Sequence, residues 1–195
     1  MLQLKMPLIL ASNSPRRKEI MTKAGFEFTV KVKETEEDFS SEMIVEKVPE
    51  YLATKKAKAF ESELDDALII CADTVVIVDG QILNKPADYA EASQMLQLLS
   101  GKTHKVVTGV CFYSKNIFET LSDTAFVTVK KMTDWEIDYY IKTCKPFDKA
   151  GAYGVQDFMG MACISKIEGS YYTVMGLPIH RVYEKLDEMG FILRN

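Results

Sequence analysis

Several features on which enzymes often depend are scarce in this sequence of 195 residues. It holds only two histidines, His104 and His180, and neither has a catalytic partner nearby in the sequence, so a Ser-His-Asp or histidine–metal mechanism has little support. The four cysteines match no zinc or redox spacing, and three lie in apolar runs, which indicates free, buried thiols in a reducing compartment. No apolar run reaches the roughly 18 residues of a membrane span.

Positive charge is also limited. Lys and Arg number 24 against 28 Asp and Glu, which gives a net charge of -4 and disfavours duplex nucleic acid as the main partner. No charged and then apolar leader opens the sequence, so we expect a cytoplasmic protein without a membrane partner. Strands alternate with helices and no repeat is present, which predicts an α/β chain with a single domain over residues 1–195.

The chain is organised around a strand followed by an unusual helix start. Residues 8–11 are apolar, Ser14 is a natural N-cap, and Pro15 fits the first turn of a helix that we expect to end near Gly25. Three cations, Arg16, Arg17 and Lys18, then occupy the end of the helix that already carries positive partial charge. Two interpretations stay open: an anion-binding site, or a solvated basic helix start.

Lys56 lies on the apolar face of a helix predicted over residues 49–61. Its stem can be buried while its amine reaches water, or the amine can point inward at a bound anion. Before that helix, residues 34–38 hold four acids; most fit a solvated loop, and one of them, Glu37 in the interpretation below, can be a metal or substrate ligand.

Asp73 interrupts the apolar run 67–78, where burial of a carboxylate is costly. A turn or bulge is the structural alternative to a functional role. Asp79-Gly80 then predicts a hairpin into residues 81–83, and Lys85 stands just beyond that strand. The glycine-dense loop 146–156 carries Lys149 and ends at Gln156, and His104 is expected in a polar turn after Gly101. Further strands are predicted at 26–32, 106–113, 118–130 and 161–167, and further helices at 89–99, 133–143 and 178–189.

The available chemistry is a set of cations and carboxylates without a histidine partner. Such a set suits polyphosphate chemistry, where positioning and charge neutralisation do most of the catalytic work. A carboxylate such as Asp73 can deprotonate a water, and others can hold Mg²⁺. The residues alone therefore indicate a site for a phosphorylated ligand and leave the reaction open.

Taken in order, the motifs resemble the Maf family of nucleotide pyrophosphatases over essentially the whole chain. They are Leu10-Ala11-Ser12-Asn13-Ser14-Pro15-Arg16-Arg17, Glu36-Glu37, Leu52-Ala53-Thr54-Lys55-Lys56-Ala57, Ala72-Asp73-Thr74-Val75-Val76, Lys85-Pro86, Leu99-Ser100-Gly101-Lys102-Thr103-His104, Asp148-Lys149-Ala150-Gly151-Ala152-Tyr153-Gly154-Val155-Gln156, Gly169-Ser170-Tyr171 and Val174-Met175-Gly176-Leu177-Pro178.

The resemblance implies a strongly curved mixed sheet flanked by helices, in two lobes with a cleft, like the Maf and ITPase-like folds. It implies hydrolysis of a nucleoside triphosphate between the α and β phosphates, with a divalent cation such as Mg²⁺ or Mn²⁺, and it suggests a homodimer. By matching position, Asp73 is the general base, Glu37 and Asp73 are the metal ligands, and the phosphate ligands are Ser12, Arg17, Lys56, Lys85 and Lys149.

Three positions separate branches of the family, and here they are Arg16, Thr74 and Gln156. This pattern resembles the branch that acts on dTTP and UTP, with modified pyrimidine nucleotides as further substrates. Two alternatives remain open: the same chemistry on another nucleotide such as 7-methyl-GTP, and a nucleotide-binding regulator of cell division with little turnover.

Overall fold

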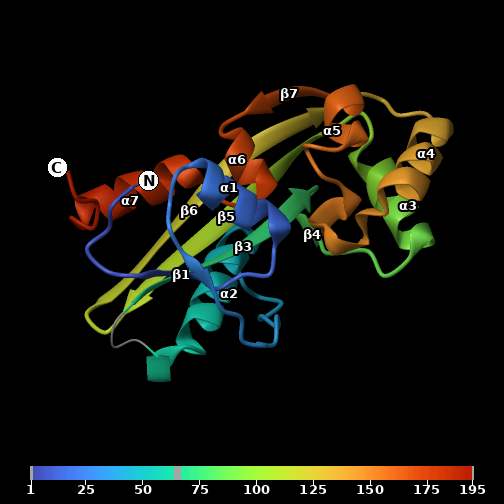
Figure 1. Cartoon of the computed structure of the whole chain (residues 1–195). Helices are drawn as coiled ribbons and strands as arrows, with labels where there is room; N and C mark the ends of the chain where they lie inside the picture. The colour runs from blue at the N-terminus through green and yellow to red at the C-terminus, as the bar shows by residue number, and fades with distance from the viewer. Residues whose placement is uncertain (1, 64–66, 195) are drawn as a thin grey trace. The chain divides into compact units, whose positions relative to one another are not determined.

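The computed structural model describes residues 2–63 and 67–194, and these residues fold as a mixed α/β structure (Figure 1). The described residues form a seven-stranded sheet in the order β2-β1-β3-β5-β6-β7, and β4 pairs with β3. Pairing is parallel for β1–β2 and β1–β3 and antiparallel for β3–β4 and β6–β7, which confirms the predicted mixed sheet with flanking helices. The strands are β1 (Leu8–Leu10), β2 (Thr29–Val30), β3 (Leu68–Val78), β4 (Gln81–Leu83), β5 (Thr103–Ser114), β6 (Ile117–Val129) and β7 (Ile164–Glu168).

The α-helices are interspersed with the strands. They are α1 (Pro15–Lys23), α2 (Val48–Lys58), α3 (Tyr89–Leu99), α4 (Asp134–Cys144), α5 (Phe158–Cys163), α6 (Tyr171–Met175) and α7 (Ile179–Glu188). However, β3–β4, β5–β6 and α6–α7 each follow one another directly. Short 3-10 turns at residues 45–47, 61–63, 146–148 and 150–152 connect them. No helix in the described part of the chain is long and apolar enough to cross a membrane.

The chain divides into two compact units. The first holds Met1–Asp73, Thr108–Asp123 and Gly176–Asn195, and the second holds Thr74–Val107 and Thr124–Met175. Strands β3, β5 and β6 therefore contribute residues to both units.

In the first unit, α2 packs on one face of β3. Side chains alternate along a strand, so Ile69 and Cys71 share a face, and both are buried in one cluster with Ala53 and Ala57 of α2. Gly109 of β5 lets the chain approach the start of α2: a Cβ at this glycine would lie 2.3 Å from the backbone nitrogen of Glu50. The small residues thus bring α2 close to the sheet and fix which of its side chains face β3.

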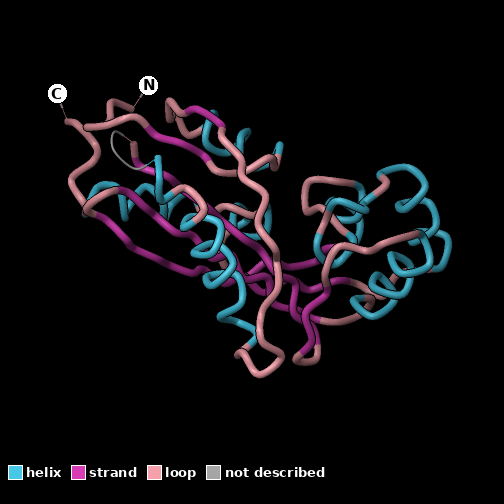
Figure 2. Tube along the Cα trace, turned by 90° about the horizontal axis from the view of Figure 1, so that it is seen from below, coloured by secondary structure: helices cyan, strands magenta, loops and turns pink. Residues whose placement is uncertain are grey.

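The second unit has its own apolar core. Buried residues of α3 and α4, among them Leu96, Leu99 and Ile141, pack with Val76 and Val127 of the strands. Helices α3 to α5 of this unit lie together in both views (Figures 1 and 2). The Asp79-Gly80 hairpin is confirmed: both residues have positive φ, 50° and 77°, and β3 and β4 pair on either side of them.

Several expected boundaries are wrong. The strand predicted at 161–167 begins only at Ile164, because Phe158–Cys163 form α5; Met161, Ala162 and Cys163 follow one another without a charge and read equally well as buried strand or helix. Helix α2 ends at Lys58 rather than at 61, and β2 pairs only at Thr29–Val30. The sequence analysis did not predict α6.

His104 is also misplaced by the sequence analysis. It lies in β5, is only 2% exposed, and its Nε2 lies 2.7 Å from the hydroxyl oxygen of Tyr153. The strand begins directly after the turn at Gly101, so a residue expected in the turn is carried into the core.

Candidate active site

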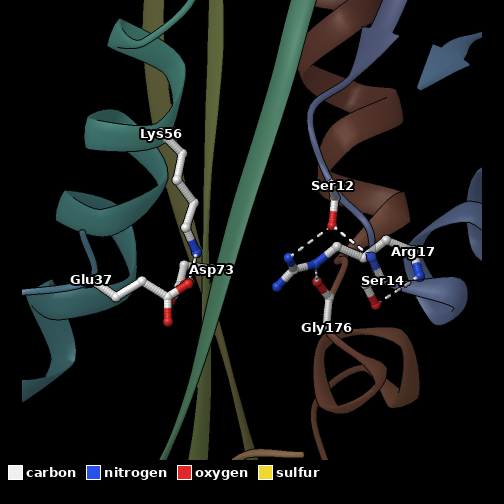
Figure 3. A network of polar contacts seen from close by, with 7 residues as sticks. All are labelled: Ser12, Ser14, Arg17, Glu37, Lys56, Asp73 and Gly176. Carbon is white, nitrogen blue, oxygen red and sulfur yellow. Dashed lines mark hydrogen bonds and ion pairs between the residues drawn. The ribbon is translucent and has the colours of Figure 1, made fainter. Parts of the chain in front are cut away.

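The end of β1 and the start of α1 place serines and an arginine together in the first unit. Ser14 caps α1 as predicted, since its hydroxyl oxygen accepts the Arg17 backbone N–H at 3.5 Å. The Ser12 hydroxyl oxygen accepts the backbone N–H of Ser14 at 3.2 Å and an Arg17 guanidinium N–H at 3.3 Å. Figure 3 shows this arginine between Ser12 and Gly176.

Gly176 is a site residue that the sequence analysis missed. Its backbone carbonyl accepts a hydrogen bond from Arg17 Nε at 2.7 Å across 159 positions of the chain. No local pattern announces a contact of that separation, although Gly176 lies within one of the family motifs. Together with the contact to Ser12, this bond fixes the plane of the guanidinium group.

Arg17 carries a partly buried charge. Burial lowers the pKa of its guanidinium, and the neighbouring positive charge of Arg16 lowers it further, while Asp73 and Glu37 oppose the effect. Arg16 and Arg17 thus form an electropositive helix start whose own N–H dipoles carry the same sign. A bound anion would relieve this excess, which favours the anion-site interpretation over the solvated one.

Asp73 lies at the end of the buried β3 face that packs on α2. The alternation Ile69, Cys71, Asp73 directs its carboxylate toward that helix, where Lys56 Nζ lies 2.5 Å from Asp73 Oδ1 (Figure 3). Glu37 joins the same amine, with its Oε1 at 2.6 Å. The Lys56 side chain is 18% exposed and the Asp73 side chain 12%, so this charge pair is largely removed from water.

The structure bears on the structural alternative for each of these two residues. Lys56 points at the carboxylates rather than reaching outward to solvent, and Asp73 stands within a continuous strand rather than at a bulge or turn. Because β1 and β3 run parallel with Leu10 opposite Ile70, Ser12 and Asp73 both follow the paired segment by two or three residues. The strand register therefore brings the two predicted residues to the same region of the first unit.

The neighbouring thiol of Cys71 is fully buried. Burial raises the pKa of Cys71 to about 12, so the group stays protonated near neutral pH. Cys71, Cys111 and Cys163 are buried and reduced, as predicted, while Cys144 is partly exposed.

The second unit carries the other predicted residues. Lys85 is exposed directly after β4, and the neighbouring Asn84 carbonyl accepts the Gly151 N–H at 3.1 Å, which joins this strand end to the loop that holds Lys149. Lys149 is 12% exposed and its Nζ lies 2.7 Å from Asp148 Oδ1 and 3.8 Å from Asp157 Oδ2.

Gln156 lies in a wall of an open cavity of about 450 Å³ in the second unit, together with Met161, Ile167 and Tyr171. Its Oε1 is buried and has no hydrogen-bond partner among residues 2–63 and 67–194. Thr74 follows Asp73 on β3 and is partly buried; the alternation of the strand turns it to the opposite face.

Glu37 and Asp73 are the predicted ligands of a divalent cation. Within residues 2–63 and 67–194, no group of three His, Cys, Asp or Glu side chains is arranged to hold a metal ion. Mg²⁺ commonly binds to one or two carboxylates and takes its other oxygens from water and substrate phosphates. Glu37 and Asp73, which share one lysine amine, fit that donor set.

The Ser12–Arg17 contact and the Asp73–Lys56 pair lie within a mixed α/β fold, and comparison with known proteins shows the class to which it belongs. The chain belongs to the Maf family: the family model described as "Maf-like protein" matches residues 7–189.

Named relatives match along nearly their whole length. A protein of Porphyromonas gingivalis named dTTP/UTP pyrophosphatase is 46% identical over 190 residues, which cover 95% of this chain and 96% of that protein. Proteins with the same name from Phocaeicola vulgatus and Bacillus pumilus are each 44% identical, over 95% and 94% of this chain and 97% and 96% of their own lengths. The Ham1 protein of Staphylococcus aureus shows a partial structural likeness, with a TM-score of 0.48 and 14% identity over 63% of this chain and 71% of that one.

Proposed function

We propose that this protein is a nucleoside triphosphate pyrophosphatase that hydrolyses dTTP and UTP to the nucleoside monophosphate and pyrophosphate. The observation that carries the proposal is the near full-length similarity, at 46% identity, to a relative named dTTP/UTP pyrophosphatase. The geometry of the first unit is consistent with it, because Asp73, Lys56 and Arg17 supply a carboxylate and two cations in one region.

In the proposed reaction, Asp73 accepts a proton from a water whose oxygen attacks the α-phosphorus. The bond from that phosphorus to the bridging oxygen breaks, and pyrophosphate leaves. Lys56 holds the Asp73 carboxylate in place from α2, as their 2.5 Å contact indicates. A carboxylate on a buried strand held by a second side chain has the rigidity that a general base requires.

Phosphate binding is assigned to Ser12, Arg17 and Lys56 in the first unit and to Lys85 and Lys149 in the second. Arg17 suits this role because the Gly176 and Ser12 contacts fix the plane of its guanidinium group, and a fixed fork of donors matches phosphate oxygens. The cations would stabilise the negative charge that builds on the leaving pyrophosphate.

A divalent cation, Mg²⁺ or Mn²⁺, is proposed to bind at Glu37 and Asp73. When bound, it supplies positive charge that polarises phosphate oxygens. Removal of divalent cations with a chelator is expected to abolish pyrophosphate release, and addition of Mg²⁺ or Mn²⁺ to restore it. Full activity after chelation would contradict this assignment.

Base selection is assigned to Arg16, Thr74 and Gln156. An amide has one acceptor and two donors, which can pair with the alternating carbonyl and N–H groups of a uracil or thymine edge. The buried, unpartnered Oε1 of Gln156 fits such a role, because a donor from the base would satisfy it.

The deciding experiment compares pyrophosphate release from dTTP, UTP, CTP, GTP, ATP and 7-methyl-GTP. The proposal predicts the highest kcat/KM for dTTP and UTP. Preference for 7-methyl-GTP would indicate the same chemistry with another base, and nucleotide binding without pyrophosphate release would indicate a regulator rather than an enzyme.

A further inference from the structure

Tyr140 is a buried polar residue that the proposed chemistry does not use. It lies on α4, its side chain is fully buried, and its hydroxyl oxygen accepts the Gly154 backbone N–H at 3.0 Å. The same hydroxyl donates to Asp157 Oδ2 at 3.2 Å. Burial raises the pKa of the phenol, so the hydroxyl keeps the proton that it donates.

The two partners of Tyr140 are the two ends of one β-turn. The Asp157 backbone N–H donates to the Gly154 carbonyl at 3.1 Å, which closes the four residues 154–157. Gln156 is the third residue of this turn. Tyr140 therefore binds the first and the fourth residue and leaves the residue assigned to base selection between them.

The fit around this turn leaves little freedom. A Cβ placed on Gly154 would lie 2.5 Å from Asp157 Oδ2 and 3.1 Å from Gln156 Nε2. The Asp157 carboxylate and the Gln156 amide thus both fold back over the space that a side chain at position 154 would fill. The absence of that side chain is what allows the carboxylate to reach the Tyr140 hydroxyl.

The orientation of Gln156 matters because its two amide ends are chemically opposite. Its Oε1 is buried beside the cavity of about 450 Å³, and no group in the described part of the chain bonds to it. A carbonyl end accepts a hydrogen bond and an amine end donates one, so a rotated or displaced amide presents the wrong pattern to a given base edge. A fixed conformation of the 154–157 turn therefore fixes which amide groups of Gln156 a base can meet.

We propose that Tyr140 is a positioning residue for base selection, which fixes the 154–157 turn and thereby the Gln156 amide. The inference rests on the proposed function, in which Gln156 contacts the base.

The first test is Tyr140→Phe, which keeps the ring in the core and removes only the hydroxyl. We measure kcat and KM for UTP, dTTP and GTP and compare the ratio of kcat/KM for UTP to that for GTP. The ratio is expected to fall about 10-fold, the order of a lost hydrogen bond, while turnover of GTP stays within about two-fold. An unchanged ratio, or an equal loss for all three nucleotides, would overturn the proposal; an equal loss would mean that Asp157 acts instead through its contact with Lys149.

A double-mutant cycle with Gln156→Ala gives the sharper result. Replacing Gln156 alone should lower the same ratio, and adding Tyr140→Phe should then lower it no further, since the hydroxyl acts through the amide. Additive losses would contradict positioning.

Tyr89→Phe is the matched control, because the Tyr89 hydroxyl also donates to a carboxylate of the second unit, Asp138 Oδ1 at 2.7 Å, rather than to Asp157. It should leave the ratio unchanged, and a fall as large as that of Tyr140→Phe would overturn the proposal. If Tyr140→Phe does not fold, Asp157→Ala removes one of the two anchors and should lower the ratio in the same direction.

Binding of non-hydrolysable UTP and GTP analogues gives a readout that needs no turnover. The preference for the UTP analogue should weaken in Tyr140→Phe. The two proposals fail differently: a wild-type protein that does not hydrolyse pyrimidine triphosphates contradicts the proposed function, whereas a selective wild type with an equally selective Tyr140→Phe contradicts only the positioning role.

Discussion

At the scale of single residues, the polar contacts of the proposed site in the first unit centre on two cationic side chains. Lys56 contacts two carboxylates, from Asp73 and Glu37, and Arg17 contacts Ser12 and the Gly176 carbonyl. The charges of Asp73 and Glu37 also act on Arg17. Replacing one of these side chains should therefore remove its own role and leave in place the packing that positions the other side chains.

Asp73→Asn tests the proposed base. The amide has almost the same shape but cannot accept a proton, so pyrophosphate release should fall by roughly 10²–10⁴-fold while nucleotide binding persists. Steady-state kinetics and an equilibrium binding titration separate the two effects. Asp79→Asn, at the exposed hairpin, serves as the control for loss of one carboxylate, and turnover of Asp73→Asn equal to that control would remove Asp73 as the base.

Arg17→Lys tests the role of the guanidinium fork. A lysine keeps the positive charge but loses the fixed pair of contacts to Gly176 and Ser12. We expect KM for the triphosphate to rise roughly 10- to 100-fold, the equivalent of one charge-assisted hydrogen bond. Arg181→Lys, at an exposed ion pair with Glu184, should leave KM unchanged; an unchanged KM in Arg17→Lys as well would argue against phosphate binding by this residue.

At the scale of elements, the caps set where the helices begin. A capping box of Thr133 and Glu136 is present: the Thr133 hydroxyl oxygen accepts the Glu136 N–H at 3.3 Å, and Glu136 Oε2 accepts the Thr133 N–H at 2.8 Å. These bonds start α4, the helix that carries Tyr140. The cap therefore helps to fix the position of the Tyr140 hydroxyl along α4.

Thr133→Ala should lower the free energy of unfolding by about 1 kcal/mol, because the first turn of α4 loses a side-chain acceptor. Denaturant unfolding followed by circular dichroism measures the change. Thr143→Ala, exposed near the other end of the same helix, is the matched control and should be neutral or slightly stabilising. Equal effects of the two variants would show that the cap does not stabilise α4.

Elements with strong local signals were predictable, and those defined by distant contacts were not. The Ser14 cap with Pro15, the Asp79-Gly80 hairpin and the period of α3 each rest on neighbouring residues, and all three are confirmed. The start of β7 was missed because an uncharged apolar run carries no period to separate strand from helix. The strand predicted at 26–32 was too long, because only Thr29 and Val30 pair with β1 in the folded sheet.

The same distinction applies to the candidate site. Asp73 and Lys56 stood out because each breaks an apolar pattern, and the structure brings them within 2.5 Å. The Gly176 carbonyl and the Tyr140 hydroxyl gave no such signal, since a backbone oxygen is common to every residue and a buried tyrosine looks like ordinary core. Their partners, 159 and 14 positions away, are known only once the chain has folded.

At the scale of the whole molecule, His104 gives stability a dependence on pH. Burial lowers its pKa from 6.5 to about 4, because a charged imidazole would lose its water beside Tyr153. Between these values the unfolded chain binds the proton more tightly than the folded one. The contribution of His104 to the free energy of unfolding is therefore fully present above pH 6.5 and is lost as pH falls toward 4. The full loss is on the order of 3 kcal/mol.

His104→Gln should remove this contribution. Its free energy of unfolding, measured in urea at pH 7, 5.5 and 4.5, should fall less steeply with acid than that of the wild type. His180→Gln replaces the exposed histidine and leaves the buried pair intact, so it should follow the wild type. Parallel curves for wild type and His104→Gln would contradict the prediction.

The burial of Cys71 has a practical consequence. Its thiol sits one pleat before Asp73, on the face that α2 covers, and it is fully shielded from solvent. A thiol reagent can reach this sulfur only when helix and strand separate. The rate of Cys71 modification therefore measures how often the region around the proposed base opens transiently. If a bound nucleotide prevents Cys71 modification, the ligand holds this part of the protein closed, and no assay of hydrolysis is needed to show it.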